Sequence, residues 1–487
     1  MTDTIVLAGL LAPWAVSAAA AAAFRRTGRA AGRLVAAGSA VSLGCAAWLW
    51  VNALGGRAAE AGPGALFRVD GLSALVAVCI AAVAGLALLP WPGVEGAAAG
   101  QERARVFRVF ASLFTLSMLV AVTINNVALM WVAIEATTIV SAILIPLHRS
   151  KASVEASWKY ILIGSVGIAL AFAGTVLAYF DFVSLLGRRQ DALNWTLLME
   201  VAPGLHADVL RLAFVFLVVG YGTKAGLAPM HTWLPDAHSE APAPLSAMMS
   251  GVLLAVAQYA IIRWKAVVDA AGGPAFTNQV LMALGLVSVA IGALSLVRQR
   301  SYKRLLAYSS VEHSGLICLG LTFGPAGVFA SLLHLLNHAL AKSMSFLLAG
   351  RILARSQSPD VDRVTGLVRA MPVTGPLFAA GVLALMGLPP FGLFVSEFLL
   401  FRAGFMSGHL AATSAAMLLA GIGFIGLAGH LARMLHGAVP EGVAAGEQAW
   451  WALAPLAVSL AVMVVLGLFL PAGVAHLLGR IAEAFSI

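Results

Sequence analysis

Apolar stretches about 20 residues long recur along the whole chain, separated by short polar breaks. The hydrocarbon core of a bilayer takes about 20 apolar residues per helix, so each stretch predicts one membrane-spanning helix. The sequence therefore predicts an all-α polytopic membrane protein. About fourteen spans are expected, over residues 4–23, 33–54, 70–90, 105–123, 126–147, 155–181, 208–230, 241–264, 278–298, 303–322, 326–354, 371–401, 410–436 and 450–478.

Composition narrows the class of protein. Of the 487 residues, 61% are hydrophobic and 10% are charged, whereas about a quarter of residues are charged in a soluble domain. No polar stretch is long enough for a soluble catalytic or nucleotide-binding domain. The net charge of +9 is concentrated in the loops after odd-numbered helices, which indicates membrane orientation rather than nucleic-acid binding. By the positive-inside rule those loops face the cytoplasm, and both termini are predicted outside a bacterial-type cytoplasmic (inner) membrane.

The sequence offers no site for a redox cofactor. Cys45, Cys79 and Cys318 stand singly in apolar segments, and no CxxC pair is present. The chain also lacks a Walker loop, a GxSxG elbow, an HExxH motif and a CxxCH motif. We expect no cofactor and no metal to be bound by this chain itself.

A weak internal repeat relates helices four to eight to helices nine to thirteen. Five helices is an odd number, so the second unit enters from the opposite face, and the units are predicted to be inverted repeats. The predicted divisions are an N-terminal three-helix segment (1–104), a first repeat (105–264), a second repeat (278–436) and a C-terminal helix (450–487). Matching positions of the two units carry Glu135 and Glu312, Lys159 and Lys342, and Lys224 and Glu397.

Each repeat also contains a predicted helix break beside an ionisable residue. Pro229 follows Lys224 in the first unit, and Pro389 and Pro390 precede Glu397 in the second. Interrupted helices at matching positions of inverted repeats are a sequence indicator of an ion path.

Charges within the spans are functional candidates because an ionisable group in hydrocarbon costs several kcal/mol. Glu135 lies mid-span, Lys224 lies next to glycines and a proline break, and Glu397 lies about two turns after the second break. For all three a functional role is favoured over a structural one. Lys159 lies near a predicted cytoplasmic helix end. Its ammonium can therefore reach the membrane–water interface, and this structural role is as well supported as a functional one.

A polar stripe is predicted on the helix over 326–354. His334, His338 and Lys342 are spaced at i, i+4 and i+8 and therefore share one face. The stripe fits a metal site, a structural ladder or a proton wire. Metal is the least favoured, since lysine is a poor ligand and no carboxylate shares the stripe. Glu312 and His313 are adjacent and point in different directions, so one of them is expected to be structural.

Residues 229–244 gather four polar side chains between two spans. Read alone, the segment fits a metal loop, but its prolines favour a rigid connection at the membrane face. The four side chains are those of His231, Asp236, His238 and Glu240.

The segment Lys224–Pro242 resembles the signature of the antiporter-like, proton-conducting subunits of respiratory complex I, Mrp antiporters and membrane-bound hydrogenases. Three further segments resemble the same family: residues 303–310 (KRLLAYSS), 338–342 (HALAK) and 387–392 (GLPPFG). The resemblance covers about residues 105–436. Residues 131–138 (WVAIEATT) and 157–160 (SWKY) look most like the hydrogenase-4 component F branch.

The resemblance implies roles for individual residues. Glu135 and Lys224 would form the input pair and Glu397 the exit. Many members carry a lysine or histidine in helix eight, where this chain has Ala255. The middle of the path would then rest on Gln258 with a water, or on the 334–342 stripe alone.

The resemblance also implies partners. The expected function is proton translocation in a redox-driven complex, with other membrane subunits and a peripheral soluble arm whose members carry iron–sulfur clusters, a NiFe centre, flavin or zinc. Two alternatives share the same residues: an Mrp-type cation/proton antiporter subunit, and the energising membrane partner of an inorganic-carbon uptake complex.

Overall fold

The computed structural model describes residues 2–23, 29–89, 101–189, 191–443, 445–447 and 449–486. The predicted end of the third helix, at residue 90, lies outside this part. The described elements are almost all helical: α1 (Thr2–Ala23), α2 (Arg29–Leu54), β1 (Ala59–Ala61), β2 (Phe67–Val69), α3 (Gly71–Leu88), α4 (Gln101–Thr123), α5 (Val127–Leu144), α6 (Lys151–Leu186), α7 (Trp195–Val201), α8 (Ala207–Ala225), α9 (Trp233–Glu240), α10 (Ala243–Met248), α11 (Leu254–Gly272), α12 (Ala275–Val297), α13 (Tyr302–Gly320), α14 (Gly324–Ser356), α15 (Leu367–Ala370), α16 (Thr374–Leu385), α17 (Gly392–Met406), α18 (Leu410–Leu435), α19 (Ala454–Leu468) and α20 (Ala472–Ala484).

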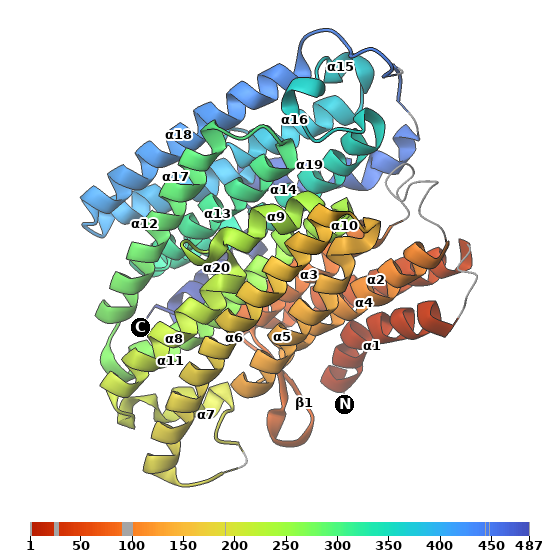
Figure 1. Cartoon of the computed structure of the whole chain (residues 1–487). Coiled ribbons are helices and arrows are strands. Elements are labelled where there is room, and N and C mark those ends of the chain that lie inside the picture. The colour runs from red at the N-terminus through yellow and green to blue at the C-terminus, as the bar shows by residue number, and fades with distance from the viewer. Residues whose placement is uncertain are drawn as a thin grey trace.

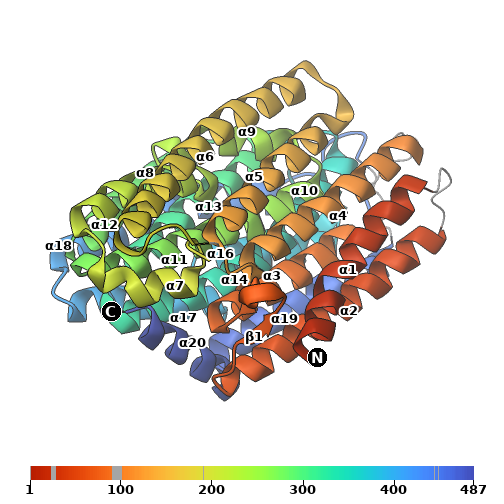
Figure 2. The ribbon, with the colours of Figure 1, turned by 90° about the horizontal axis from the view of Figure 1, so that it is seen from below.

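The long helices run side by side as one bundle (Figure 1). In the part of the chain that is described, eleven helices are long and apolar enough to cross a membrane. In the view of Figure 2, the hairpin β1–β2 lies beside the start of the chain. The backbone N–H of Glu60 donates to Asp3 over 3.4 Å, and the ring of Phe485 stacks on Trp195 with centroids 5.8 Å apart.

The first helix break positions a buried half-helix. α8 ends at Ala225, and Gly226 follows with φ 72°, a conformation that favours glycine. The chain then re-enters a helix as α9, in which Trp233 and His238 are 0% exposed. Residues 229–244, expected as a rigid connection at the membrane face, are thus largely helical: α9 is a second half-helix packed against α6 and α13.

The predicted span 241–264 is one buried column with an irregular turn. α10 passes through a π-helical turn at Met249–Leu253 into α11. Because π turns widen a helix locally, this column is not a uniform α-helix, and π turns occur often at functional sites.

The end of the chain also differs from the prediction. The single helix expected over 450–478 is two helices, α19 and α20, separated at 469–471. α20 is tied to the bundle at Arg263, which stacks on Trp195 and Phe485 at 4.3 and 5.3 Å from the ring centroids. Arg263 also donates two hydrogen bonds of 2.6 Å to Asp70, the N-cap of α3.

Small residues allow the central helices to approach closely. A Cβ built on Gly167 of α6 would lie 2.7 Å from Thr223 of α8, and one on Gly220 would lie 2.6 Å from Ala171. Glycine is the residue that leaves room for such contacts, as is common between membrane helices. This close packing brings Lys224 of α8 against α5 and α6.

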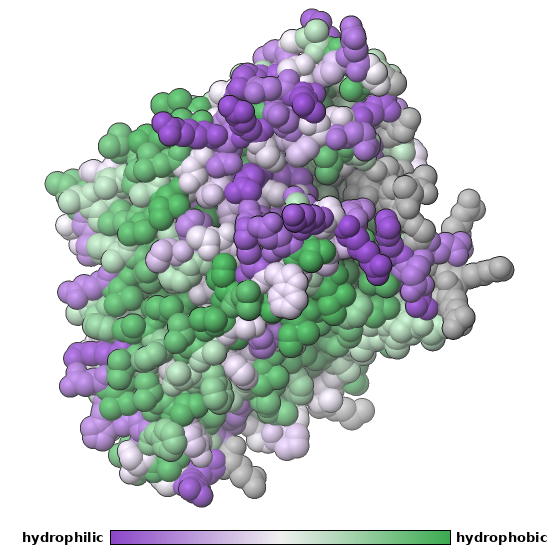
Figure 3. Space-filling view, viewed as in Figure 1, coloured by the Kyte–Doolittle hydropathy of each residue, from purple (hydrophilic) through white to green (hydrophobic). Residues whose placement is uncertain are grey.

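The surface is apolar and the interior carries polar groups. Hydrophobic residues cover most of the middle of the face shown in Figure 3, and hydrophilic ones gather above it, over α10 and α15. Ile139, Leu162 and Phe180 are 59, 59 and 65% exposed, whereas Lys224 and Lys342 are 0% exposed. This distribution suits a bilayer outside and an ionisable path inside.

Candidate functional site: two buried polar networks

The first network joins α5 to α8 through a hydroxyl. The ammonium of Lys224 donates to the hydroxyl of Thr138, which donates in turn to Glu135 Oε2 over 3.1 Å. The carboxylate of Glu135 also accepts from Ser165 over 3.4 Å. The two residues predicted as the input pair therefore share one network, and Thr138 bridges them.

Tyr160 of α6 completes the surroundings of Lys224. Its hydroxyl accepts from Lys224 Nζ over 3.4 Å and lies 2.8 Å from Ser141 Oγ. The ammonium lies 4.9 Å from the centroid of the same ring, a distance that allows a cation–π attraction. Lys224 is thus a fully buried cation held by hydroxyls and an aromatic face.

The middle of the molecule is crossed by a shorter link. Gln258 of α11 donates to Ser314 Oγ over 2.8 Å, and Ser314 donates to the carbonyl of Ala225 over 2.5 Å. This link reaches the end of α8, one residue from Lys224. Gln258 is therefore linked to the end of α8 and to α13, the helix that carries His313, while Ala255 supplies no polar group.

The second network begins at Lys342 of α14. Its ammonium donates to the carbonyl of Leu306 over 2.7 Å and to the hydroxyl of Ser309. His338 lies one turn before it, with its ring centroid 5.2 Å from that of His313. The Nε2 atom of His338 is buried and has no hydrogen-bond partner among the described residues.

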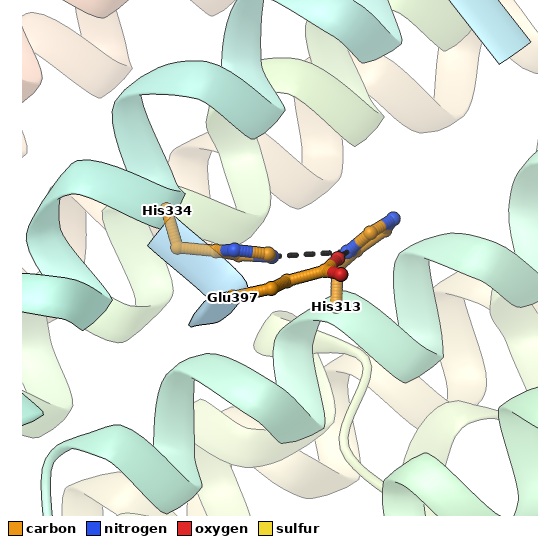
Figure 4. Close-up of side chains that lie close together, drawn as sticks. All are labelled: His313, His334 and Glu397. Carbon is orange, nitrogen blue, oxygen red and sulfur yellow. Dashed lines mark hydrogen bonds and ion pairs between the residues drawn. The ribbon is translucent and has the colours of Figure 1, made fainter. Parts of the chain in front are cut away.

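Two histidines and a carboxylate form the far end of this network (Figure 4). His313 Nδ1 lies 2.9 Å from His334 Nε2 and 3.9 Å from Glu397 Oε1. His334 Nδ1 lies 3.0 Å from Ser396 Oγ, which donates to the carbonyl of Leu393 over 2.9 Å. The predicted stripe on α14 is thereby joined to His313 of α13 and to Glu397 of α17.

The second helix break positions Glu397. α16 ends at Leu385 and α17 begins at Gly392, after Pro389 and Pro390. Between them Gly387 has φ 64°, and a Cβ on it would collide with the Glu397 carboxylate. The break therefore makes room for the carboxylate, whose side chain is 15% exposed.

Glu312 and His313 point in different directions, as adjacent helical residues must. Glu312 lies against glycines of α12 and α18, and a Cβ built on Gly423 would lie 2.6 Å from its carboxylate. Glu312 is thus buried beside the second network, but it faces α12 and α18 rather than His334.

Lys159 lies in a different setting. Its ammonium pairs with Glu155 at 2.8 Å and with Asp236 at 3.2 Å, and 46% of its side chain is exposed. Arg304 also pairs with Asp236 at 2.7 Å. These contacts place Lys159 in an ion-pair cluster near the start of α6, and none of them joins it to Lys224.

The four polar residues of 229–244 do not converge. Asp236 joins the ion-pair cluster, while His238 stacks on Phe346 with centroids 5.1 Å apart. In the described residues, the group that could hold a metal ion is His313, His334 and Glu397, whose ligand atoms all lie within 4.8 Å of one another. The carboxylate that the 334–342 stripe lacks in sequence is supplied by α17.

Several hydroxyl groups of the networks were not singled out from the sequence. Thr138 had a local signal, since it lies three residues after Glu135 and so shares its helix face. Ser309, Ser314 and Ser396 had none, because their partners lie on other helices.

The comparisons with known proteins agree with this architecture. Residues 124–423 match the family model described as NADH:quinone oxidoreductase/Mrp antiporter, transmembrane. A hydrogenase-4 component F homolog of Methylacidiphilum infernorum is 42% identical over 63% of this chain, and hydrogenase-4 component B of Escherichia coli is 33% identical over 63%. The alignments cover 64% and 46% of those two relatives.

Solved structures share the fold over nearly the whole chain. A chain of the archaeal membrane-bound sulfane sulfur reductase superposes with a TM-score of 0.87 at 24% identity, covering 99% of this chain and 98% of that one. A chain of the Mrp complex from Dietzia sp. gives 0.86 at 20% identity and covers 100% of both. Because the family model covers more than half of the residues, the chain belongs to the antiporter-like membrane subunit family of NADH:quinone oxidoreductases and Mrp antiporters.

Proposed function

We propose that this chain is the proton-translocating membrane subunit of a multi-subunit complex driven by redox chemistry in its partners. The observation that carries the proposal is the fully buried Lys224, joined through the hydroxyl of Thr138 to Glu135. A charged side chain in the membrane interior costs free energy, so a buried cation usually marks a functional site. The family to which the chain belongs supports the same function.

The Thr138 bridge suggests how a proton is released. While Glu135 accepts the Thr138 hydrogen bond, its charge stabilises the Lys224 ammonium. A conformational change that separates Glu135 from Thr138 removes this stabilisation, and the ammonium gives up its proton. The link through Ser314 and Gln258 leads onward from the end of α8.

The second network would carry the proton to the exit. Lys342, His338, His313 and His334 follow one another toward Glu397, and each imidazole can accept a proton at one nitrogen and release one at the other. Glu397 is the most exposed member of this end of the network, so it is the proposed exit.

The proposal includes an architecture. About fourteen spans would form two inverted repeats, 105–264 and 278–436, each with its broken helix, α8–α9 and α16–α17. Both termini would lie outside the cytoplasmic membrane. The packing of α4 with α5 corresponds to that of α12 with α13, and the packing of α6 with α8 corresponds to that of α14 with α17, which supports two repeated units.

The redox centres would lie in partner subunits. The described cysteines Cys45, Cys79 and Cys318 are single and free, and the redox groups of the complex, iron–sulfur clusters, a NiFe centre or flavin, are proposed for a peripheral arm. The relatives named for hydrogenase-4 components support a hydrogenase or quinone-reductase type of complex.

The test is Lys224→Met in the assembled complex, with Lys159→Met as the matched control. Proton uptake is followed by dye quenching in inverted membrane vesicles supplied with the electron donor. We expect Lys224→Met to abolish uptake and Lys159→Met to retain it, because Lys159 is half exposed and outside both networks. Wild-type uptake by Lys224→Met would overturn the proposal. Donor-independent proton release driven by added Na⁺ would instead identify a cation/proton antiporter.

A further inference from the structure

Three ligand-bearing side chains from three different helices meet inside the second network (Figure 4). They are His313 of α13, His334 of α14 and Glu397 of α17, and their ligand atoms lie within 4.8 Å of one another. We propose that these residues bind one divalent transition-metal ion, zinc by their chemistry, and that the bound ion closes the proton path. The binding rests on the geometry alone, whereas the closure rests on the proposed function.

The spacing fits a tetrahedral ion. Zinc binds imidazole nitrogen and carboxylate oxygen at about 2.0–2.2 Å, so two ligand atoms of one tetrahedron lie about 3.3 Å apart. His313 Nδ1 lies 2.9 Å from His334 Nε2 and 3.9 Å from Glu397 Oε1, so one distance is shorter and the other longer than the tetrahedral spacing. Side-chain shifts of less than about 1 Å bring both to the tetrahedral spacing.

The donor set selects the class of metal. Two imidazoles and one carboxylate form the ligand set of open zinc sites, in which water takes the fourth position. Calcium and magnesium prefer all-oxygen sets, so they are poor occupants. The carboxylate offsets part of the ion's charge, which matters because His313 and His334 are 2% and 0% exposed.

Outer contacts already orient one ligand. His334 Nδ1 lies 3.0 Å from Ser396 Oγ, and that hydroxyl donates to the carbonyl of Leu393. The Nδ1 atom therefore carries the hydrogen, and the lone pair of Nε2 faces the site. Such an outer partner fixes the orientation of a metal-binding histidine. The backbone of Leu385 lies beside the His313 ring, so Nε2 can hold the proton while Nδ1 binds the metal.

The ion has a route to the site. The Glu397 side chain is 15% exposed, and Pro389 and Pro390 of the neighbouring break are exposed. The ammonium of Lys342, two turns along α14 from His334, opposes a further cation. We therefore expect reversible binding that is weaker than in a closed structural zinc site.

The bound ion would interrupt proton transfer at this point. It replaces the direct contact between His313 and His334 and occupies the lone pairs that accept protons. It also holds the Glu397 carboxylate, the proposed exit. A proton arriving from His338 would then have no acceptor.

The test titrates zinc into the purified, assembled complex and measures affinity with a chromophoric zinc chelator. Cobalt(II) is added separately, because a tetrahedral site gives it intense visible absorption. We expect one site per chain, lost in His334→Ala and Glu397→Gln and weakened at least about tenfold in Ser396→Ala, the usual cost of removing an outer partner. His430→Gln, a buried histidine of α18 outside the cluster, is the control and should bind as the wild type does.

Equal zinc affinity in the wild type, His334→Ala and Glu397→Gln would overturn the site. Ser396→Ala changes no ligand and only one hydroxyl, so it tests the site even if the ligand variants fail to assemble. Zinc binding without inhibition of proton uptake would retain the site but overturn the proposed closure.

Discussion

Replacing Thr138 with valine removes the bridge between Glu135 and Lys224 without changing the packed volume. The valine methyl occupies the place of the hydroxyl, so Thr138→Val acts on hydrogen bonding alone. Lys224 Nζ keeps Tyr160 as an acceptor at 3.4 Å, and Glu135 keeps Ser165 at 3.4 Å. Both remaining contacts are long, so the substitution uncouples the pair.

The size of the effect follows from the two lost bonds. A hydrogen bond to a charged group contributes about 1.5–3 kcal/mol, and Thr138 makes one to each partner. We take about 2 kcal/mol as the increase in the activation free energy of proton transfer. Since about 1.4 kcal/mol corresponds to a tenfold change in rate, the proton-translocation rate falls roughly 30-fold. Electron transfer measured in parallel shows whether the complex remains assembled.

Thr137→Val is the matched control for this experiment. Thr137 is the adjacent buried threonine, but its hydroxyl donates to the carbonyl of Ile134 in its own helix over 2.5 Å. We expect near wild-type proton uptake in Thr137→Val and in Thr138→Ser, which retains the bridging hydroxyl. Similar rates in Thr138→Val and Thr137→Val would refute the bridge.

Two further predictions concern stability. Arg263→Met leaves the Asp70 carboxylate, whose side chain is 19% exposed, without its ion-pair partner. The cost is below the roughly 3–5 kcal/mol of a fully buried pair and should lower the melting temperature in detergent. Arg211→Met, at an exposed pair, should change the melting temperature little, and equal shifts in the two variants would contradict the reasoning. Burial raises the pKa of Glu447, but hydrogen bonds led by those from Thr374 lower it more, so the net pKa lies below the ordinary value. The Glu447 carboxylate therefore contributes fully to the stability of the folded state above about pH 4.3. This contribution is lost as the pH falls through the lower pKa of the folded state. Hydrogen exchange in residues 367–375 should accelerate in the wild type as Glu447 becomes protonated, whereas Glu447→Gln should show no such change with pH. Identical pH profiles of the two proteins would contradict a stabilising contact between Glu447 and Thr374.

The helical pattern could be predicted because it depends on local sequence. A membrane-spanning helix needs a run of apolar residues long enough to cross the bilayer, and the length of such a run can be read from the sequence. The structure has helices at every predicted range, and the breaks after Lys224 and before Glu397 follow from glycine and proline. Residues 233–240 were misassigned because prolines and charges are typical of a loop, whereas burial against α6 and α13 makes this segment a helix.

The ionisable residues could also be found from the sequence, since charges are rare in apolar spans. Their partners could not. Thr138 bridges two helices, and Ser396 and Glu397 reach His334 only because α16 breaks and α17 packs beside α14. A metal site on the 334–342 stripe was disfavoured for want of a carboxylate, and one lies 3.9 Å from His313. Contacts between helices depend on rotation, depth and crossing angle, which are decided by packing rather than by spacing along the chain. The sequence thus determined which residues are buried and charged, and the tertiary structure decided which of them meet.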